Sequence, residues 1–292
     1  MTTAQTAPAP NWDADLQVYE PHRAGLPKFR PYFRDLFSRL EFAAEFSRSG
    51  IRAAHTQTVF GQLWLVLNPL LLACVYYFLV AVIGSGGGLP LLAHITAGLF
   101  IFNLVAQSLS GGASSVTGGG RLILNMAFPR LLMPLSAVRT AFFRFLPTIP
   151  VYFVIKAIAG TPWNWSVLCG LYFLLMCTIF SLGVSALMAT LQVYFRDATS
   201  FLPFFTRIWL YMSPVLWTID SIDKDGAWAK FLPLELYGNP LFSLIGGWTE
   251  STLLGKTPPL AVWIMAAVWA CIALVGGSLY FMSRERDFAV RI

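Results

Sequence analysis

Six long apolar stretches, separated by short segments rich in glycine, proline or charge, dominate the hydrophobic pattern of the chain. About 20 helical residues cross a bilayer core of about 30 Å, so stretches of this length predict transmembrane helices. The third is expected to begin near Ala137 and to be kinked by Pro147 and Pro150. Residues 110–120 are too rich in glycine and serine to favour a helix, so the second is expected to end before them. The six apolar stretches are 63–83, 89–109, 145–158, 167–191, 201–219 and 260–282.

Two shorter apolar segments, 228–236 and 241–248, lie between the fifth and sixth stretches. Each has about nine residues, too few to cross a bilayer, and the turn Gly238-Asn239-Pro240 separates them. This pattern predicts a re-entrant helical hairpin within the outer region 220–258, which needs protein or a water-filled cavity around its tip. The alternative is a loop at the membrane surface.

An amphipathic stretch, 29–52, precedes the first span. Apolar residues recur there at three- and four-residue steps, as Phe29, Phe33 and Phe37 illustrate, while charged residues such as Arg34 fall largely on the other side. The pattern predicts a helix lying on the cytoplasmic leaflet, with arginines meeting anionic headgroups. A helix of a soluble domain is the alternative. We expect 1–28 to be a flexible cytoplasmic segment and 29–292 to be one transmembrane domain.

Composition supports a membrane protein. Apolar residues make up 57% of the 292 residues and charged residues 12%, whereas soluble proteins carry about 25% charged residues. Sixteen of the twenty lysines and arginines fall on one side if both termini are cytoplasmic, and this positive excess sets the orientation. It also explains the basic net charge of +6 without nucleic acid. The four exceptions are Lys156, Lys224, Lys230 and Lys256.

Signals of catalysis are weak. The chain has neither a His-Glu-x-x-His nor a Gly-x-Ser-x-Gly motif, and Glu250 stands where a phosphate-binding loop ending in Gly255-Lys256-Thr257 needs glycine. The scattered histidines and cysteines suggest no metal site. The six spans contain no Asp or Glu, which proton- or sodium-coupled carriers usually have, although backbone carbonyls can also bind sodium. Lys156 and Arg207 lie near span ends and can snorkel to water. The energy source is therefore expected to be another polypeptide.

Several short motifs follow one another along the chain. They are Thr56-Gln57-Thr58-Val59-Phe60-Gly61-Gln62-Leu63-Trp64 with Leu67-Asn68-Pro69-Leu70, Leu122-Ile123-Leu124 with Phe128-Pro129-Arg130 and Leu132-Met133-Pro134-Leu135, Tyr194-Phe195-Arg196-Asp197 with Ser213-Pro214-Val215, and Asn239-Pro240-Leu241. In this order they resemble the ABC-type permeases that export polysaccharides. The resemblance covers the chain from about Phe29 to its end.

The resemblance implies a homodimer that recruits two copies of a separate ATPase. ATP and Mg²⁺ would bind to the ATPase, and this chain would need no cofactor. The dimer would enclose a channel for a lipid-linked polysaccharide of the O-antigen, teichoic acid or cell-wall galactan type. It would lie in the bacterial cytoplasmic membrane and serve cell-wall biogenesis.

The resemblance and the aromatic pattern together suggest four sets of site residues. ATPase coupling would involve Leu124, Asn125, Phe128, Pro129, Arg130, Arg196 and Asp197. A cytoplasmic gate would involve Phe33, Phe37, Arg48, Arg52, Gln57 and Trp64. A substrate channel would involve Tyr76, Tyr77, Phe102, Tyr211 and Trp217, because aromatic rings stack on sugars, although ordinary packing explains any one of them as well. An exit gate would involve Tyr237, Asn239, Pro240 and Phe242.

Two departures from the family pattern concern the coupling loop. Asn125 and Met126 stand where the family often has lysine, and Leu131 stands where an acidic residue often follows the arginine. Packing of Phe128 is therefore expected to matter more than charge. Two alternatives stay open: a permease for drugs or other hydrophobic compounds, and a membrane-embedded glycosyl or lipid transferase. The transferase would depend on the outer acidic residues Asp220, Asp223, Asp225 and Glu235.

Overall fold

Helices form every regular element that the computed structural model describes, in residues 26–54, 60–83, 87–218 and 232–291. Within these ranges five helices or helix pairs are long and apolar enough to cross a membrane. They are α3 (Trp64–Ile83), α4 (Leu89–Gly118), α6 (Leu132–Phe145) with α7 (Thr148–Ile158), α8 (Cys169–Tyr194) and α12 (Leu260–Arg284). The all-helical, membrane-spanning class predicted from the sequence is confirmed.

The predicted fifth span corresponds to α9 (Ala198–Met212), which has only 15 residues. At 1.5 Å per residue it is about 22 Å long, and the helix ends immediately before Ser213 and Pro214. Pro203 lies inside the helix without ending it. The count of six spans, with 201–219 as one of them, therefore stays a prediction.

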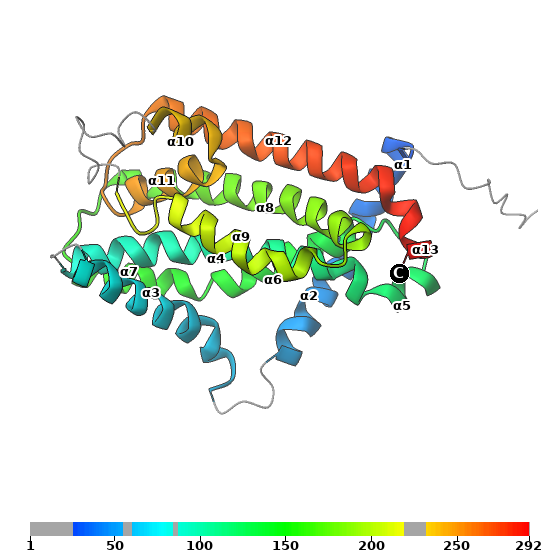
Figure 1. The fold of residues 1–292 in the computed structure, drawn as a ribbon, viewed down its shortest axis with the longest axis horizontal. Helices are drawn as coiled ribbons and strands as arrows, with labels where there is room; N and C mark the ends of the chain where they lie inside the picture. Colours follow the sequence, from blue (N-terminus) through cyan, green and yellow to red (C-terminus); the bar gives the residue numbers. More distant parts are fainter. Residues whose placement is uncertain (1–25, 55–59, 84–86, 219–231, 292) are drawn as a thin grey trace, which may run out of the picture.

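The long helices run side by side and define two ends of a bundle (Figure 1). The α13 end carries α5 (Gly120–Asn125), the 3-10 helix η6 (Glu285–Asp287) and α13 (Phe288–Arg291). The opposite, α11 end carries α10 (Leu232–Gly238) and α11 (Pro240–Thr252). Two further 3-10 helices, η2 (Gly61–Leu63) and η3 (Trp165–Leu168), lead into α3 and α8.

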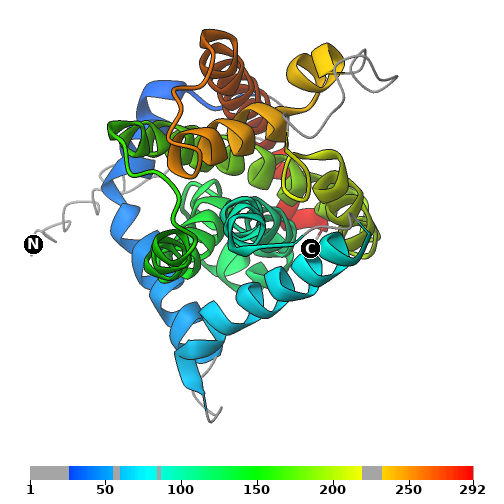
Figure 2. The ribbon, with the colours of Figure 1, turned by 90° about the vertical axis from the view of Figure 1, so that its left-hand side faces the viewer.

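Helix α4 lies in the middle of the bundle, as the end-on view shows (Figure 2), and most of its residues from Ala93 to Val116 are buried. Helices α8 and α12 pack closely because glycines face each other where they cross. A Cβ atom on Gly183 would lie 2.1 Å from the Ala273 carbonyl, and one on Gly277 would lie 2.0 Å from the Gly183 carbonyl oxygen. Small residues let helix backbones approach in this way in membrane proteins.

The expectation that residues 110–120 would not hold a helix is wrong, because α4 continues to Gly118. The serine hydroxyls bond to carbonyls one turn earlier: Ser110 Oγ donates to Ala106 O at 3.1 Å and Ser114 Oγ to Ser110 O at 3.1 Å. Gly112 lets Ser185 of α8 approach, since a Cβ there would lie 2.2 Å from Ser185 Oγ. Satisfied hydroxyls and close packing override the low helix propensity.

The third span begins at Leu132, five residues before the expected Ala137, and it is divided into α6 and α7 at Leu146–Pro147. The predicted interruption at Pro147 is confirmed. Pro150 lies in the first turn of α7 and does not break it, since backbone N–H groups there have no partner within the helix to lose.

Lys156 does not snorkel to water as expected. Its side chain is fully buried, its ammonium donates to the Thr252 carbonyl at the end of α11, and it lies 4.7 Å from the ring centroid of Trp163. A cation at a helix C-terminus meets the negative end of the helix dipole, and the indole face adds a cation–π contact. These partners explain why the charge remains inside the bundle.

The amphipathic stretch 29–52 forms two helices, α1 (Phe29–Ser38) and α2 (Leu40–Ala54), rather than one. Arg39 leaves the helical conformation between them, with φ −110° and ψ 19°. Leu36 and Ala43 of these helices join a separate apolar cluster at the α13 end, together with Phe281 and Phe288. The amphipathic face thus packs partly on protein.

The two short segments near the C-terminus form α10 and α11, joined at Asn239, as the lengths predict. Eleven of the thirteen residues of α11 are buried, and the helix contacts α8, α12 and α4. Insertion of this pair into the membrane as a re-entrant hairpin stays a prediction.

Candidate functional site

The predicted coupling residues lie at the α13 end, and three of them, Phe128, Pro129 and Arg130, are held against the bundle. Phe128 is half-buried, and its ring centroid lies 5.4 Å from that of Phe42 in α2. Pro129 is buried. The Arg130 guanidinium donates to the Glu285 carbonyl of η6. Phe128 therefore anchors the loop 126–131 to α2.

Tyr32 connects α1 to the same cluster. Its hydroxyl donates to the buried Glu285 carboxylate at 2.7 Å. Burial, with the Glu285 carboxylate beside it, raises the pKa of the Tyr32 hydroxyl above its usual range, so the hydroxyl keeps its proton and remains a donor. Burial lowers the pKa of the Arg130 guanidinium while Glu285 and Tyr32 oppose the shift. The group stays charged, because the ordinary pKa of arginine is so high.

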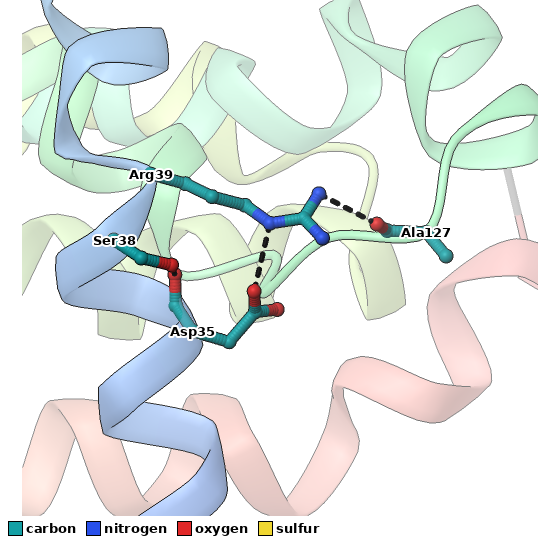
Figure 3. A network of polar contacts seen from close by, with 4 residues as sticks. All are labelled: Asp35, Ser38, Arg39 and Ala127. Carbon is teal, nitrogen blue, oxygen red and sulfur yellow. Dashed lines mark hydrogen bonds and ion pairs between the residues drawn. The ribbon is translucent and has the colours of Figure 1, made fainter.

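Arg39 ties the junction of α1 and α2 to the coupling loop (Figure 3). Its Nε donates to Asp35 Oδ1 at 2.8 Å, and its NH1 donates to the Ala127 carbonyl at 3.0 Å. Ser38 Oγ donates to the Asp35 carbonyl at 2.9 Å in the same turn. Arg39 does not stand out in the sequence, because it is one of several arginines in the amphipathic stretch 29–52 and nothing in the pattern distinguishes it from the others.

The exposed side chains of the coupling region are mainly neutral. Asn125 and Met126 are exposed at the end of α5, and the side chain of Leu124 lies outside the described part. Phe195, on the second predicted turn, is 65% exposed. Its neighbours Arg196 and Asp197 are also exposed. Helix α13 contacts both α5 and α8, so the two predicted turns lie at one end of the bundle.

The second turn is fixed to the C-terminal segment. Tyr194 donates to Asp287 Oδ2 at 2.8 Å, and its ring centroid lies 4.3 Å from the guanidinium carbon of Arg291. Arg196 NH2 donates to the Arg291 carbonyl at 3.4 Å. Gln192 closes the turn, since its amide donates to the Arg196 carbonyl at 2.8 Å and accepts from the Thr199 N–H at 2.9 Å.

The predicted cytoplasmic gate residues do not form one cluster. Phe33 packs half-buried on the apolar cluster of the α13 end, whereas Phe37 is 64% exposed. Arg48 and Arg52 are exposed on α2. The Trp64 ring meets the Phe60 ring edge-on at 5.6 Å at the start of α3. Gln57 lies outside the described residues.

A polar cavity of about 350 Å³ lies between α2, α4 and α6. Gln107 and Arg144 line it, and their Oε1 and Nε atoms are buried without a hydrogen-bond partner among the described residues. Buried polar atoms are normally paired in native proteins. This cavity was not predicted from the sequence. Arg144 contributed there only to the orientation in the membrane, and the glycine- and serine-rich residues 110–120 indicated only the end of a helix. Hydroxyls add to the lining through Ser114, Ser115, Ser136 and Thr140.

Three of the predicted channel aromatics lie close to one another. The rings of Tyr76 in α3 and Tyr211 in α9 meet edge-on at 6.3 Å, and Trp217 Nε1 donates to the Tyr211 carbonyl at 3.3 Å. Tyr77 is half-buried on α3. Phe102 is 4% exposed inside the bundle, so we leave it out of the proposed path.

Asn239 links three helices at the α11 end. Its Oδ1 accepts from Trp209 Nε1 at 2.9 Å and from the Leu241 N–H at 3.1 Å. Its Nδ2 donates to the Met212 carbonyl at 3.3 Å and to Glu235 Oε2 at 3.0 Å. The other predicted exit-gate residues differ in exposure: Phe242 is buried, Pro240 is half-buried, and Tyr237 is exposed. The ring centroids of Phe242 and Trp217 lie 6.1 Å apart.

These features define a multi-pass helical membrane protein with a cavity between α2, α4 and α6 that polar side chains help to line. The chain is 28% identical over 231 residues to the O-antigen export system permease protein RfbA of Klebsiella pneumoniae, covering 79% of this chain and 87% of that protein. It is 25% identical over 259 residues to the protein of the same name from Myxococcus xanthus, covering 89% of this chain and 98% of that protein. No protein-family model matches. The resemblance to ABC-type polysaccharide export permeases is confirmed.

Proposed function

We propose that this chain is the membrane-spanning subunit of an ABC exporter that moves a lipid-linked polysaccharide across the bacterial cytoplasmic membrane. The observation that carries the proposal is the polar cavity between α2, α4 and α6, which an amide and hydroxyls of α4 and hydroxyls and a guanidinium of α6 line. Hydroxyl-rich sugars and phosphates need such partners, because unpaired polar groups inside a membrane cost several kcal/mol each. The O-antigen permease relatives support the same substrate class.

The α13 end is the proposed cytoplasmic side, with both termini there, because most arginines lie at that side of the spans. A homodimer would bind two copies of a separate ATPase, which would hold ATP and Mg²⁺. The exposed Met126 and Phe195 are the proposed apolar contacts with the ATPase, with Asn125, Arg196 and Asp197 around them. Phe128 and Arg130 would then transmit motion rather than make the contact themselves.

Movement of the loop 126–131 would move α1 and α2. Arg39 holds the Ala127 carbonyl, Phe42 packs on Phe128, and Ser47 accepts from Thr140 of α6 at 3.0 Å. Since α2 also lines the polar cavity through Phe46 and Gly50, ATP-driven displacement of the loop would change access to that cavity. Coupling of this kind requires that α2 has two positions and that both the ATPase at the loop and the substrate in the cavity favour one of them.

The aromatic contacts at Tyr76, Tyr211 and Trp217 are the proposed continuation of the path toward the α11 end. Stacking on aromatic faces tolerates sliding from one sugar to the next. The α10–α11 pair, held by Asn239, is the proposed exit gate.

The test combines the purified chain with its ATPase in proteoliposomes and measures ATP hydrolysis as lipid-linked glycan is added. We expect glycan to stimulate hydrolysis. Arg144→Gln should raise the half-saturating glycan concentration about tenfold, the effect of losing one charge-assisted hydrogen bond. Arg34→Gln on the exposed face of α1 is the matched control and should behave as the unchanged protein.

Stimulation by hydrophobic drugs but not by glycan would favour the drug permease instead. The transferase alternative would be favoured by glycosyl or lipid transfer without the ATPase. Of its four outer acids, Glu235 is already bonded to Asn239, and Asp220, Asp223 and Asp225 lie outside the described residues.

A further inference from the structure

A groove of about 450 Å³ lies between α2, α6 and α8. Helix α6 separates it from the polar cavity, because residues 135, 138, 139 and 142 line the groove whereas 136, 137, 140, 141 and 144 line the cavity. Apart from Arg139 and Thr178, the lining is apolar, with Leu40 of α2 and Leu174 of α8 among its members. The groove is therefore a site separate from the proposed substrate path.

Among the described residues, Arg139 is the one charged residue lining this groove. Its Nε is buried without a hydrogen-bond partner, and its guanidinium carbon lies 5.1 Å from the ring centroid of Phe143. In the ranges that the structure describes, no carboxylate forms an ion pair with it. A cation half-buried against apolar side chains is stabilised by an anion at the same place.

The lining of the groove extends along α8. Its residues on that helix run from Leu171 to Thr178, a rise of about 10 Å. Ser185 Oγ, further along α8, donates to the Pro134 carbonyl of α6 at 3.4 Å and helps to hold the two helices together. Leu171 and Leu175 are more than half exposed. The groove thus lies beside the amphipathic α2 and opens onto exposed apolar side chains of α8.

We propose that the groove binds one acyl chain of an anionic membrane phospholipid and that Arg139 binds the phosphate of that lipid. The amphipathic α2 marks the headgroup level, and Arg139 lies on the part of α6 that shares the groove with Leu40 and Ala43. An apolar groove with one basic side chain in its lining matches an acyl chain that ends in a phosphate, and basic pockets between membrane helices bind anionic headgroups. Among the described residues, the lining holds no acid that would bind the amine of a zwitterionic lipid.

The test uses the purified full-length chain in nanodiscs of phosphatidylcholine with or without phosphatidylglycerol. Native mass spectrometry measures retained phosphatidylglycerol, and thermal unfolding measures the stabilisation that it gives. We expect Arg139→Gln to weaken phosphatidylglycerol binding about fivefold, the contribution of one basic residue near an anionic lipid surface. Lys256→Gln, which removes an exposed positive charge after α11 and away from the groove, is the control and should leave binding unchanged.

A second variant fills the groove and keeps the charge of Arg139. Leu175→Trp begins from a residue that is 55% exposed, so folding should survive, and we expect retention of phosphatidylglycerol to fall as in Arg139→Gln. Equal retention by both variants and the unchanged chain would overturn the proposal, as would equal stabilisation by the two lipids. The absence of retained phosphatidylglycerol from the unchanged chain would also overturn it. These measurements need neither ATPase nor glycan, so their failure leaves the proposed function standing.

Discussion

Asn239 uses every hydrogen-bonding position of its amide within a buried site, and its four partners belong to α9, α10 and α11. Replacement by alanine leaves the Trp209 N–H, the Met212 carbonyl and the Glu235 carboxylate without this partner. The position is therefore expected to stabilise the α11 end rather than only to terminate a helix.

Asn239→Ala should lower the free energy of unfolding by about 1–3 kcal/mol, because buried polar groups lose their partners. Thermal unfolding in detergent measures the effect, and proteolysis reports whether α10 has become loose. Asn164→Ala is the control, since Asn164 is exposed and its side chain makes one hydrogen bond among the described residues, to the Gly255 carbonyl at 3.2 Å. Equal melting midpoints for the two variants would contradict the role assigned to Asn239.

Gly183 and Gly277 determine how closely α8 and α12 approach. Gly183→Ala would place a methyl group within 2.1 Å of the Ala273 backbone, and overpacking of this kind costs about 1–3 kcal/mol. Gly276→Ala is a matched control one residue away from Gly277, because its Cβ would meet nothing within 4 Å. We expect the melting midpoint to fall for Gly183→Ala and to hold or rise for Gly276→Ala. The opposite order would show that the helices are not packed in this way.

At the scale of elements, α1 and α2 are connected to the coupling loop by contacts that no periodicity predicts. The amphipathic pattern predicted one helix on the membrane surface. The helix is interrupted at Arg39, whose guanidinium donates to the Ala127 carbonyl. The side chains that make these contacts come from segments 88 residues apart in the chain. Two elements joined in this way should move together when the ATPase acts.

Arg39→Gln combined with Phe42→Ala should reduce ATP-driven glycan export at least about fivefold while ATPase binding persists, since allosteric coupling is typically worth 5–150-fold. Co-purification measures binding, and proteoliposome transport measures export. Phe29→Ala, which truncates a 46% exposed ring on α1, serves as the control. Full export by the double variant would separate α1 and α2 from the coupling pathway.

For the whole molecule, the sequence sufficed to predict the helical class, five of the six expected spans and the two short helices α10 and α11, because these depend on length and apolar runs. The length of α4 could not be predicted from the sequence. Its serine hydroxyls bond to carbonyls of the same helix and Gly112 packs against Ser185, and these contacts outweigh the low helix propensity of glycine and serine. Lys156 was misjudged for a similar reason, since its partners Thr252 and Trp163 become neighbours only in the folded bundle.

The candidate site was predicted unevenly. The motifs singled out the two turns that lie at the α13 end and the hydrogen-bonded Asn239, and the coupling role of the turns stays a prediction. The cavity beside Gln107 and Arg144 arises from α2, α4 and α6 together. A helical pattern places residues on faces of one helix, but it does not specify which face meets which neighbour. The roles of Phe102 and Phe128 changed for the same reason, because burial depends on the partner helices.

The most direct test of the account is translocation of a fluorescent lipid-linked glycan in proteoliposomes, with and without the ATPase and ATP–Mg²⁺. Our account predicts that glycan reaches the opposite leaflet only when the chain, the ATPase and ATP–Mg²⁺ are all present. Translocation by the purified chain alone would contradict it.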